Sequence, residues 1–380
     1  MPKYRFSEIA INVTDKRMPV PEDKDLYIAP NNLDTDTLSV PEYGYKVDLN
    51  GTKLIMHKGD MLFGRREPQL KKAAIAPHNG LFSAHGMIFH PREEVITKEF
   101  FPFFISSDYF FDAAIRISVG SLSPTVNWKD LKDLEFDIPD LKAQREYAKV
   151  LWAMIRAKKA YKELIKKTDD LVKSQFIEMF DLPSENRHGY EVGRIGDVVC
   201  DVHYGTSKKA TNDGKYTYLR MNNITYSGEL DLTDTKRINI PDKDLAGCMV
   251  KRGDVLFNRT NSRDLVGKTC VFNLDEPMVI AGYIIRLRMN GRILPEYLST
   301  FLNLDSSKKM LYAMAKGAVG QANINAQEVR SIEMIIPPRE VQLHFKNMIE
   351  QSDKSKFAAK QALDNLNASQ KALMNQIFGE

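Results

Sequence analysis

The amino-acid sequence predicts an α+β protein with a pseudo-two-fold internal repeat, in which two similar globular domains are each followed by one long helix. Two observations lead to this prediction. The stretch Pro139–Phe180 recurs without a gap as Pro337–Phe378, at a constant offset of 198 positions. The segments that precede the two stretches also share short, strand-like motifs. Because similarity at a fixed offset indicates a repeated structural unit, the whole chain is expected to consist of two such units.

The repeat also sets the expected domain boundaries. At 380 residues the chain is long enough for two or more domains. The first domain is predicted at 1–137, the first long helix at 138–181, the second domain at 182–336 and the second long helix at 337–380. The stretch 181–189 is polar and contains a proline and a glycine, which is typical of a connector.

Within the domains, the same motifs occur in the same order. The motif G-D-x-L-F-x-R begins at Gly59 and again at Gly253. Asn127 and Asn325 are each followed three residues later by an acidic residue, a pattern that predicts a capped helical turn. A strand-like apolar run follows each turn, at 134–138 and 332–336. Other short apolar runs, separated by turn signals, predict a small irregular sheet with helical pieces near 99–113 and 295–315.

Both long stretches have the pattern of a coiled-coil helix. Mostly apolar residues recur in alternating steps of four and three, so the two helices are expected to pack on each other. About 38 residues at 1.5 Å each give a rod of roughly 57 Å. The predicted seam comprises Tyr147, Leu151, Met154, Ile165 and Val172 in the first helix and Phe345, Ile349, Leu363, Leu366 and Leu373 in the second, with Val150, Ala157, Leu164 and Leu171 widening the first stripe.

A lysine lies at the middle of both stripes, at Lys158 and at the equivalent Lys356. Two interpretations remain open. A polar residue within a seam can fix the register of a coiled coil. Alternatively, both lysines extend their aliphatic stems along the edge of the seam and keep the ammonium group in water.

Composition limits the functional classes. The net charge is only +4, so composition alone does not indicate a nucleic-acid-binding protein. The three cysteines form no C-x-x-C pair, which favours a reducing compartment. The N-terminal residues lack the apolar core of a signal peptide, and no apolar run approaches the length of a membrane span. These observations predict a cytoplasmic protein.

Catalytic signatures are missing from the sequence. It contains no G-x-G-x-x-G motif and no adenine-methyltransferase motif, and its seven histidines have no metal-ligand spacing. Gly267-Lys268-Thr269 resembles the end of a phosphate-binding loop, but Ser262 occupies the position of the required glycine. We therefore expect no catalytic residue, no metal and no cofactor in this chain.

Polar, basic loops remain as candidate binding elements. Arginine and lysine reach phosphates and guanine edges, asparagine and glutamine reach adenine edges, and glycine permits a close approach of the backbone. The candidate DNA-contacting residues are Arg65, Arg66, Lys71 and Lys72 in the first unit and His203, Tyr204, Lys208, Lys209, Asn258, Arg259, Arg263, Lys316 and Gln321 in the second. For Asn127 and Asn325 we expect helix capping in place of ligand contact.

Over essentially its whole length, the chain resembles the DNA specificity subunits of type I restriction-modification systems. The resemblance rests on the two G-D-x-L-F-x-R segments, on V-G-Q-x-N-I at 319–324, and on I-P-x-x-x-x-Q at 138–144 and 336–342. The first unit departs from the pattern at 121–126, where it lacks the Q-x-N-I sequence, and it also lacks the Gly-Thr-Ser-Lys loop of the second unit.

The resemblance implies a function without catalysis. Each globular domain would be a target-recognition domain that reads one half of a bipartite DNA site. The helices would pack antiparallel, set the spacer between the half-sites and recruit two methyltransferase subunits, which use S-adenosylmethionine to methylate adenine. Restriction subunits with translocase and nuclease activity can join such an assembly.

The sequence is compatible with two other functions. The chain could serve a related system in which nuclease and methyltransferase are fused, or it could be a coiled-coil adaptor that binds only proteins. Binding to defined DNA half-sites would exclude the adaptor. A third possibility, an enzyme in its own right, has no support in the sequence.

Overall fold

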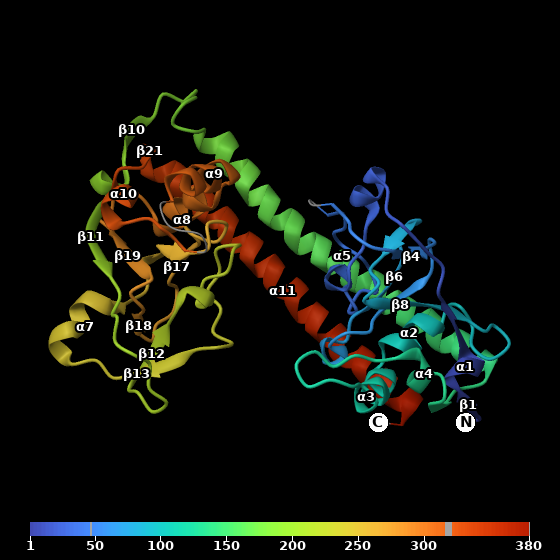
Figure 1. Cartoon of the computed structure of the whole chain (residues 1–380). Coiled ribbons are helices and arrows are strands. Elements are labelled where there is room, and N and C mark those ends of the chain that lie inside the picture. The colour runs from blue at the N-terminus through green and yellow to red at the C-terminus, as the bar shows by residue number, and fades with distance from the viewer. Residues whose placement is uncertain (46–47, 316–320, 380) are drawn as a thin grey trace. The chain divides into compact units, whose positions relative to one another are not determined.

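The computed structural model describes residues 1–45, 48–315 and 321–379 (Figure 1). The chain forms two compact units, of which the first contains residues 1–164 and 358–380 and the second contains residues 165–357. The division therefore falls inside the two long helices, α5 (Leu141–Phe180) and α11 (Arg339–Phe378), and each helix contributes residues to both units. Both helices begin two residues after the proline that opens the repeat.

The first unit is built on an antiparallel four-stranded sheet in the order β2-β8-β5-β6. A three-stranded sheet, β3-β4-β7, and the pair β1-β9 complete its strands. The strands are β1 (Lys3–Arg5), β2 (Ala10–Val13), β3 (Lys16–Arg17), β4 (Lys53–Met56), β5 (Met61–Gly64), β6 (Ala73–Ile75), β7 (Gly80–Phe82), β8 (Gly86–Pro91) and β9 (Glu135–Asp137); the short helices are α1 (Phe6–Ile9), α2 (Phe101–Ser106), α3 (Asp108–Arg116) and α4 (Trp128–Leu131).

The core of the first unit is rich in phenylalanine. Phe6 contacts Phe89 edge-on with ring centroids 5.2 Å apart, and Phe104 contacts Phe136 in the same way at 5.2 Å. The same core includes Leu151 from α5 and Phe378 from the end of α11. The N-terminal part of α5 and the C-terminal end of α11 are therefore held by burial against one domain.

The second unit has a corresponding four-stranded antiparallel sheet in the order β11-β19-β15-β17. A second four-stranded sheet, β13-β12-β18-β14, and the pairs β16-β20 and β10-β21 accompany it. The strands are β10 (Glu191–Arg194), β11 (Val199–Tyr204), β12 (Tyr216–Leu219), β13 (Lys236–Ile238), β14 (Met249–Val250), β15 (Val255–Asn258), β16 (Thr260–Asn261), β17 (Thr269–Val271), β18 (Met278–Ile280), β19 (Ile284–Met289), β20 (Ala322–Asn323) and β21 (Glu333–Ile336); the short helices are α6 (Ile195–Val198), α7 (Asp242–Cys248), α8 (Pro295–Asn303), α9 (Asp305–Met314) and α10 (Ala326–Arg330).

The core of the second unit holds the opposite ends of the long helices. Phe176 and Phe180 of α5 contact Phe345 of α11, with ring centroids 5.4 and 5.3 Å apart. Both α5 rings also contact Tyr297 of α8, at 4.9 and 4.8 Å. The C-terminal part of α5 and the N-terminal part of α11 thus share this core.

A buried glutamine at the start of each long helix confirms the repeat at the level of hydrogen bonds. The Gln144 amide oxygen accepts the N–H of Thr97 at 2.7 Å, and its amide nitrogen donates to the carbonyls of Val95 and Pro139. Gln342 accepts the N–H of Leu294 at 2.7 Å and donates to Arg292 and Pro337. Each glutamine therefore joins its own helix to the preceding domain through an equivalent set of hydrogen bonds.

The residues of the predicted helix seam and the residues expected to widen it differ in burial. All ten predicted seam residues are buried or half-buried. Of the residues expected to widen the first stripe, however, Val150, Leu164 and Leu171 are 48%, 48% and 56% exposed. The buried positions of α5 include Ala148 and Ile155. The stripe is thus widened on the side opposite to the predicted one.

Neither interpretation of the two central lysines describes them fully. The Lys158 side chain is 3% exposed, and its ammonium group lies 2.8 Å from the carboxylate of Asp36 in a loop of the first domain. Lys356 is also largely buried and pairs with Asp169 of α5 at 2.9 Å and with Glu229 at 3.6 Å. Both lysines therefore connect a long helix to acidic groups of their own unit.

Of the two predicted capping asparagines, one is confirmed and the other is wrong. The Asn325 side chain accepts the N–H of Glu328 at 2.9 Å and completes a capping box at the start of α10. The Asn127 side chain makes no capping bond to α4. It instead accepts a hydrogen bond from Arg65, as described below.

Three further predictions concern local features. The strand-like runs at 134–138 and 332–336 are β9 and β21, and the helical pieces are α2 with α3 and α8 with α9. All three cysteines are free thiols. Among the described residues, no helix is both long and apolar enough to cross a membrane, and no group of three histidine, cysteine or acidic residues could hold a metal ion.

Candidate nucleic-acid interface

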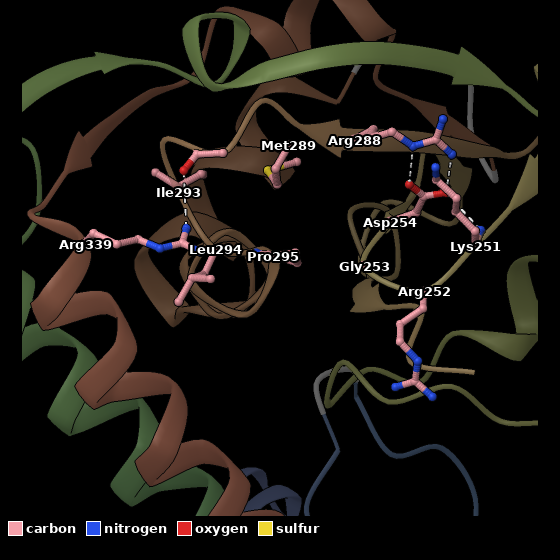
Figure 2. Close-up of a pocket in the computed structure, with 11 residues that line it drawn as sticks. Lys251, Arg252, Gly253, Asp254, Arg288, Met289, Ile293, Leu294, Pro295 and Arg339 are labelled. Atoms are coloured by element: carbon pink, nitrogen blue, oxygen red, sulfur yellow. Dashed lines mark hydrogen bonds and ion pairs between the residues drawn. The ribbon is translucent and has the colours of Figure 1, made fainter. Parts of the chain in front are cut away.

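The G-D-x-L-F-x-R motif forms a turn followed by a buried strand in both units. Gly253 has a φ of +90°, a conformation that favours glycine, and Asp254 after it is 1% exposed. The Asp254 carboxylate accepts a hydrogen bond from the backbone N–H of Lys251. It also accepts two hydrogen bonds from the guanidinium of Arg288 on β19, both 2.8 Å long (Figure 2). In the first unit Asp60 likewise accepts from the His57 backbone and contacts the His90 imidazole at 2.7 Å. The motif aspartate is therefore structural.

The motif arginine lies at the other end of this strand. Four residues of β15 separate Asp254 from Arg259, which is about 13 Å of extended chain. The carbonyl of Arg259 accepts the N–H of Ile324 at 2.9 Å, and the carbonyl of Arg65 accepts the N–H of Val126 at 2.9 Å. Arg65 and Arg259 thus occupy equivalent places in the two units.

The surroundings of the two arginines differ. The Arg259 guanidinium lies over the ring of Tyr204, 4.7 Å from its centroid, and the Tyr204 hydroxyl accepts the N–H of Ala326 at 2.8 Å. Arg65 instead donates to the side-chain oxygen of Asn127 at 2.9 Å. The Arg259 guanidinium also donates to the carbonyl of Gly282 at 3.5 Å, so each arginine makes one hydrogen bond within the protein and has further donors.

The other candidates described in the second unit are mostly exposed. Lys208 pairs with Asp244 at 2.7 Å, and His203 contacts Asp201 at 2.8 Å. Arg263 lies 4.5 Å from the centroid of the Tyr312 ring. Lys209 and Gln321 are exposed, and Lys316 lies outside the described residues.

The prediction that Asn258 contacts DNA is wrong. Its side chain is 0% exposed. The amide nitrogen donates to the carbonyls of Thr260 and Tyr283, and the amide oxygen accepts from Asn261 at 3.0 Å. Asn258 ends a strand whose four residues are all buried, so its amide serves to hold the loop that carries Arg259.

In the first unit, the basic candidates divide into two groups. Lys71 is ion-paired with Asp108 and lies 3.5 Å from Asp112. Burial alone would lower the pKa of Lys71, but these two carboxylates outweigh it and raise the pKa. Arg66 is exposed, and the half-buried Lys72 donates to the carbonyl of Leu33 at 3.3 Å. Among the described residues, neither Arg66 nor Lys72 makes an ion pair with a carboxylate.

Arg66 and Lys72 also line a cavity that the sequence did not indicate. The cavity has a volume of about 420 Å³. Its other polar lining residues include Asn31, Lys53 and His85, together with the buried Tyr27. Lys53 and His85 stand at the ends of strands distant in sequence from the motif arginine, so no local pattern connected them with it.

Comparisons with known proteins agree with this geometry. Residues 187–366 match the family described as the type I restriction modification DNA specificity domain. A putative type I restriction enzyme specificity subunit of Methanocaldococcus jannaschii is 25% identical over 205 residues, 53% of this chain and 47% of that protein. The EcoKI specificity subunit of Escherichia coli K12 is 23% identical over 296 residues, 72% of this chain and 62% of that protein. The chain thus spans about half to three-fifths of the length of these relatives.

Solved structures show the same fold. The crystal structure of a type I restriction-modification S subunit from M. genitalium superposes with a TM-score of 0.54 at 13% identity, covering 99% of this chain and 96% of that one. A chain from a structural study of assembly and conformational transition of a type I system gives a TM-score of 0.55 at 20% identity, covering 99% and 97%.

Proposed function

We propose that the chain belongs to the type I restriction-modification DNA specificity family, and its function follows from this premise. It acts without catalysis, as the subunit that selects the DNA sequence on which an adenine methyltransferase, and a restriction enzyme where one is present, will act. The observation that carries this proposal is the pair of equivalent arginines, Arg65 and Arg259, at the same strand end in two similar units. Arginine at a fixed position is the commonest reader of guanine edges.

Each unit reads one half of a split DNA site. Two observations support this proposal. The two units share a similar four-stranded sheet, and their equivalent arginines have different neighbours, Tyr204 beside Arg259 and Asn127 beside Arg65. Two reading surfaces that share a scaffold but differ in their contacts favour an asymmetric target with two unlike halves.

The two long helices form an antiparallel coiled coil that sets the distance between the half-sites. The antiparallel arrangement is supported by the two cores, each of which contains the start of one helix and the end of the other. The core of the first unit contains Leu151 and Phe378, and that of the second contains Phe176 and Phe345. Each helix has 40 residues and is about 60 Å long, which corresponds to roughly 18 base pairs at 3.4 Å each.

The partners are double-stranded DNA, two methyltransferase subunits and, in a restricting assembly, two restriction subunits. Exposed apolar residues on both helices support a protein partner, since Val150 and Leu171 of α5 are 48% and 56% exposed and Phe357 of α11 is 62% exposed. S-adenosylmethionine is expected in the methyltransferase and no cofactor in this chain. The assembly works in the cytoplasm, where the DNA is.

Selection of randomised duplex DNA tests the proposal. The chain is purified with its co-expressed partners, and the bound duplexes are sequenced. A split motif with a fixed gap is expected. One continuous motif would mean that only one unit reads DNA, and no enrichment by a folded complex would favour the protein adaptor. A partner that carries nuclease and methyltransferase in one chain would identify the related, fused system.

A further inference from the structure

We propose that the cavity beside Arg66 in the first unit is a binding site for a phosphate group, and that in the assembled complex it holds one backbone phosphate next to the first half-site. The second part of this proposal rests on the proposed DNA-reading function. The phosphate site itself rests only on the lining of the cavity.

Four basic side chains reach the cavity from four strand ends. Arg66 follows β5, Lys53 begins β4, Lys72 precedes β6 and His85 precedes β8. The pairing of β5 with both β6 and β8 brings three of these ends together, because Gly64 at the end of β5 lies opposite Gly86 and next to Lys72. The positions of Arg66, Lys72 and His85 are therefore fixed by the register of this sheet.

The positive charge of the cavity is only partly balanced. The two carboxylates in its lining are Asp48, which is already ion-paired with Lys24, and Glu67. Lys53 donates to the backbone carbonyls of Asn50 and Gly51. Burial lowers the pKa of His85, and the charges of Arg66, Arg65 and Lys53 lower it further. The imidazole thus experiences an excess of positive charge that an anion would neutralise.

The shape of the site favours phosphate over a base edge. Base edges lie inside the grooves of a duplex and are reached by side chains that protrude from a protein. A concave site receives the part of the duplex that protrudes, which is the sugar-phosphate backbone. Guanidinium and ammonium groups are the side chains that bind phosphate oxygens most strongly, and Asn31 offers a neutral donor in the same lining.

The second unit provides an internal comparison. There, Thr260 stands at the position of Arg66 and Tyr283 at that of His85, as the paired strands β15 and β19 show. The counterpart of Lys72 is Lys268, which is 7% exposed, donates to the carbonyl of Met221 at 2.8 Å and has a pKa lowered by burial. The basic cavity is therefore a feature of the first unit.

The first arm of the test uses inorganic phosphate and the full-length chain. The pKa of His85 is followed by NMR in protein with labelled histidine, and a His85→Gln variant assigns the resonance. Phosphate in the site is expected to raise this pKa in the wild type but not in Arg66→Gln. Lys58→Gln is the matched control, because Lys58 is exposed in the same unit at the other end of β5. An unchanged His85 pKa at saturating phosphate would overturn the site.

The second arm identifies the source of the phosphate. Duplexes that carry a single neutral methylphosphonate at successive positions around the first half-site are bound to the wild-type complex and to Arg66→Gln. One position is expected to weaken wild-type binding roughly tenfold and to have little effect on the variant. If the split motif is bound but no position behaves in this way, the assignment to a DNA phosphate is wrong while the proposed function stands. Absence of a split motif would instead refute the proposed function.

Discussion

The stacking of Arg259 on Tyr204 fixes the direction of a charged side chain without neutralising it. The guanidinium is 4.7 Å from the ring centroid, and its Nε atom is buried without a hydrogen-bond partner in the described part of the chain. One terminal nitrogen donates to the carbonyl of Gly282 at 3.5 Å. If Arg259 binds DNA as proposed, its side chain is already held in place, so little conformational entropy is lost on binding.

We predict that Arg259→Gln alters recognition at one position of the second half-site and leaves the first half-site unchanged. Loss of a bidentate contact to guanine costs about 1–3 kcal/mol, or roughly 5- to 150-fold in preference at that base pair. Selection and sequencing with the variant complex measure the change, and Arg252→Gln at the other end of β15 is the control. A simultaneous change in both half-sites would show that the two units do not read separately.

The buried amine of Lys308 is expected to make the stability of the protein depend on pH. Burial, assisted by the charges of Lys173 and Lys268, lowers the pKa of Lys308 to about 7, and its amine donates to the carbonyl of Gly267 at 2.7 Å. Between this pKa and the ordinary value of 10.5, the unfolded chain binds more protons than the folded chain, so stability rises with pH across this window.

We therefore expect Lys308→Met to raise the free energy of unfolding most at about pH 7 and below, where the wild type must bury an ammonium group. The gain, on the order of a few kcal/mol, should shrink as the pH rises toward 10.5. Urea unfolding at several pH values measures it. Lys309→Met, at an exposed neighbouring position, should show no such trend, and a gain that does not depend on pH would contradict the prediction.

At the residue scale, the sequence predicted the equivalent positions of Arg65 and Arg259 better than it predicted which neighbouring side chains are buried. Arg259 is the last residue of a motif that recurs in both units, so its position could be predicted. The inward orientation of Asn258 depends on the strand register, which composition does not reveal. Lys53 and His85 were missed for the same reason, because pairing of distant strands brings them beside Arg66.

At the scale of elements, each long helix is fastened to its domain by buried polar groups. Gln144 and Gln342 do this at the helix starts, and Lys158 and Lys356 do it near the middle. The offset of 198 positions made these pairs visible in the sequence. Their partners could not be predicted, because Asp36 and Glu229 belong to loops with little sequence similarity.

Lys158 and Asp36 should respond unequally to mutation. Lys158→Met places an apolar chain of similar length at a site that is 3% exposed, so a small effect on stability is expected. Asp36→Ala leaves the ammonium group of Lys158 buried without this partner. Asp36 is 38% exposed, so we expect a loss on the order of 2 kcal/mol, less than for a fully buried pair.

Thermal unfolding of the two single variants and the double variant measures this asymmetry. The double variant should be nearly as stable as Lys158→Met alone, because the unpaired charge is then absent. If Lys158→Met were the more damaging single change, the ion pair would contribute net stability and the argument from buried charge would fail.

At the scale of the whole molecule, the proposed function requires that helix length determine the gap between the two half-sites. A deletion of seven residues from the middle of both α5 and α11 removes two turns, so the apolar stripes stay in register. Each helix then shortens by about 10 Å, which corresponds to roughly three base pairs. We expect the selected DNA motif to keep both half-sites and to lose about that much spacer.

The opposite change provides the control for this prediction. Insertion of seven residues at the same places should lengthen the spacer by a similar amount, again with unchanged half-sites. The readout is the sequence of selected duplexes, so reduced affinity alone does not obscure it. If both variants bound DNA with the wild-type spacer, the helices would hold the units together without measuring the distance between them, and the gap would have to be set by the partner subunits.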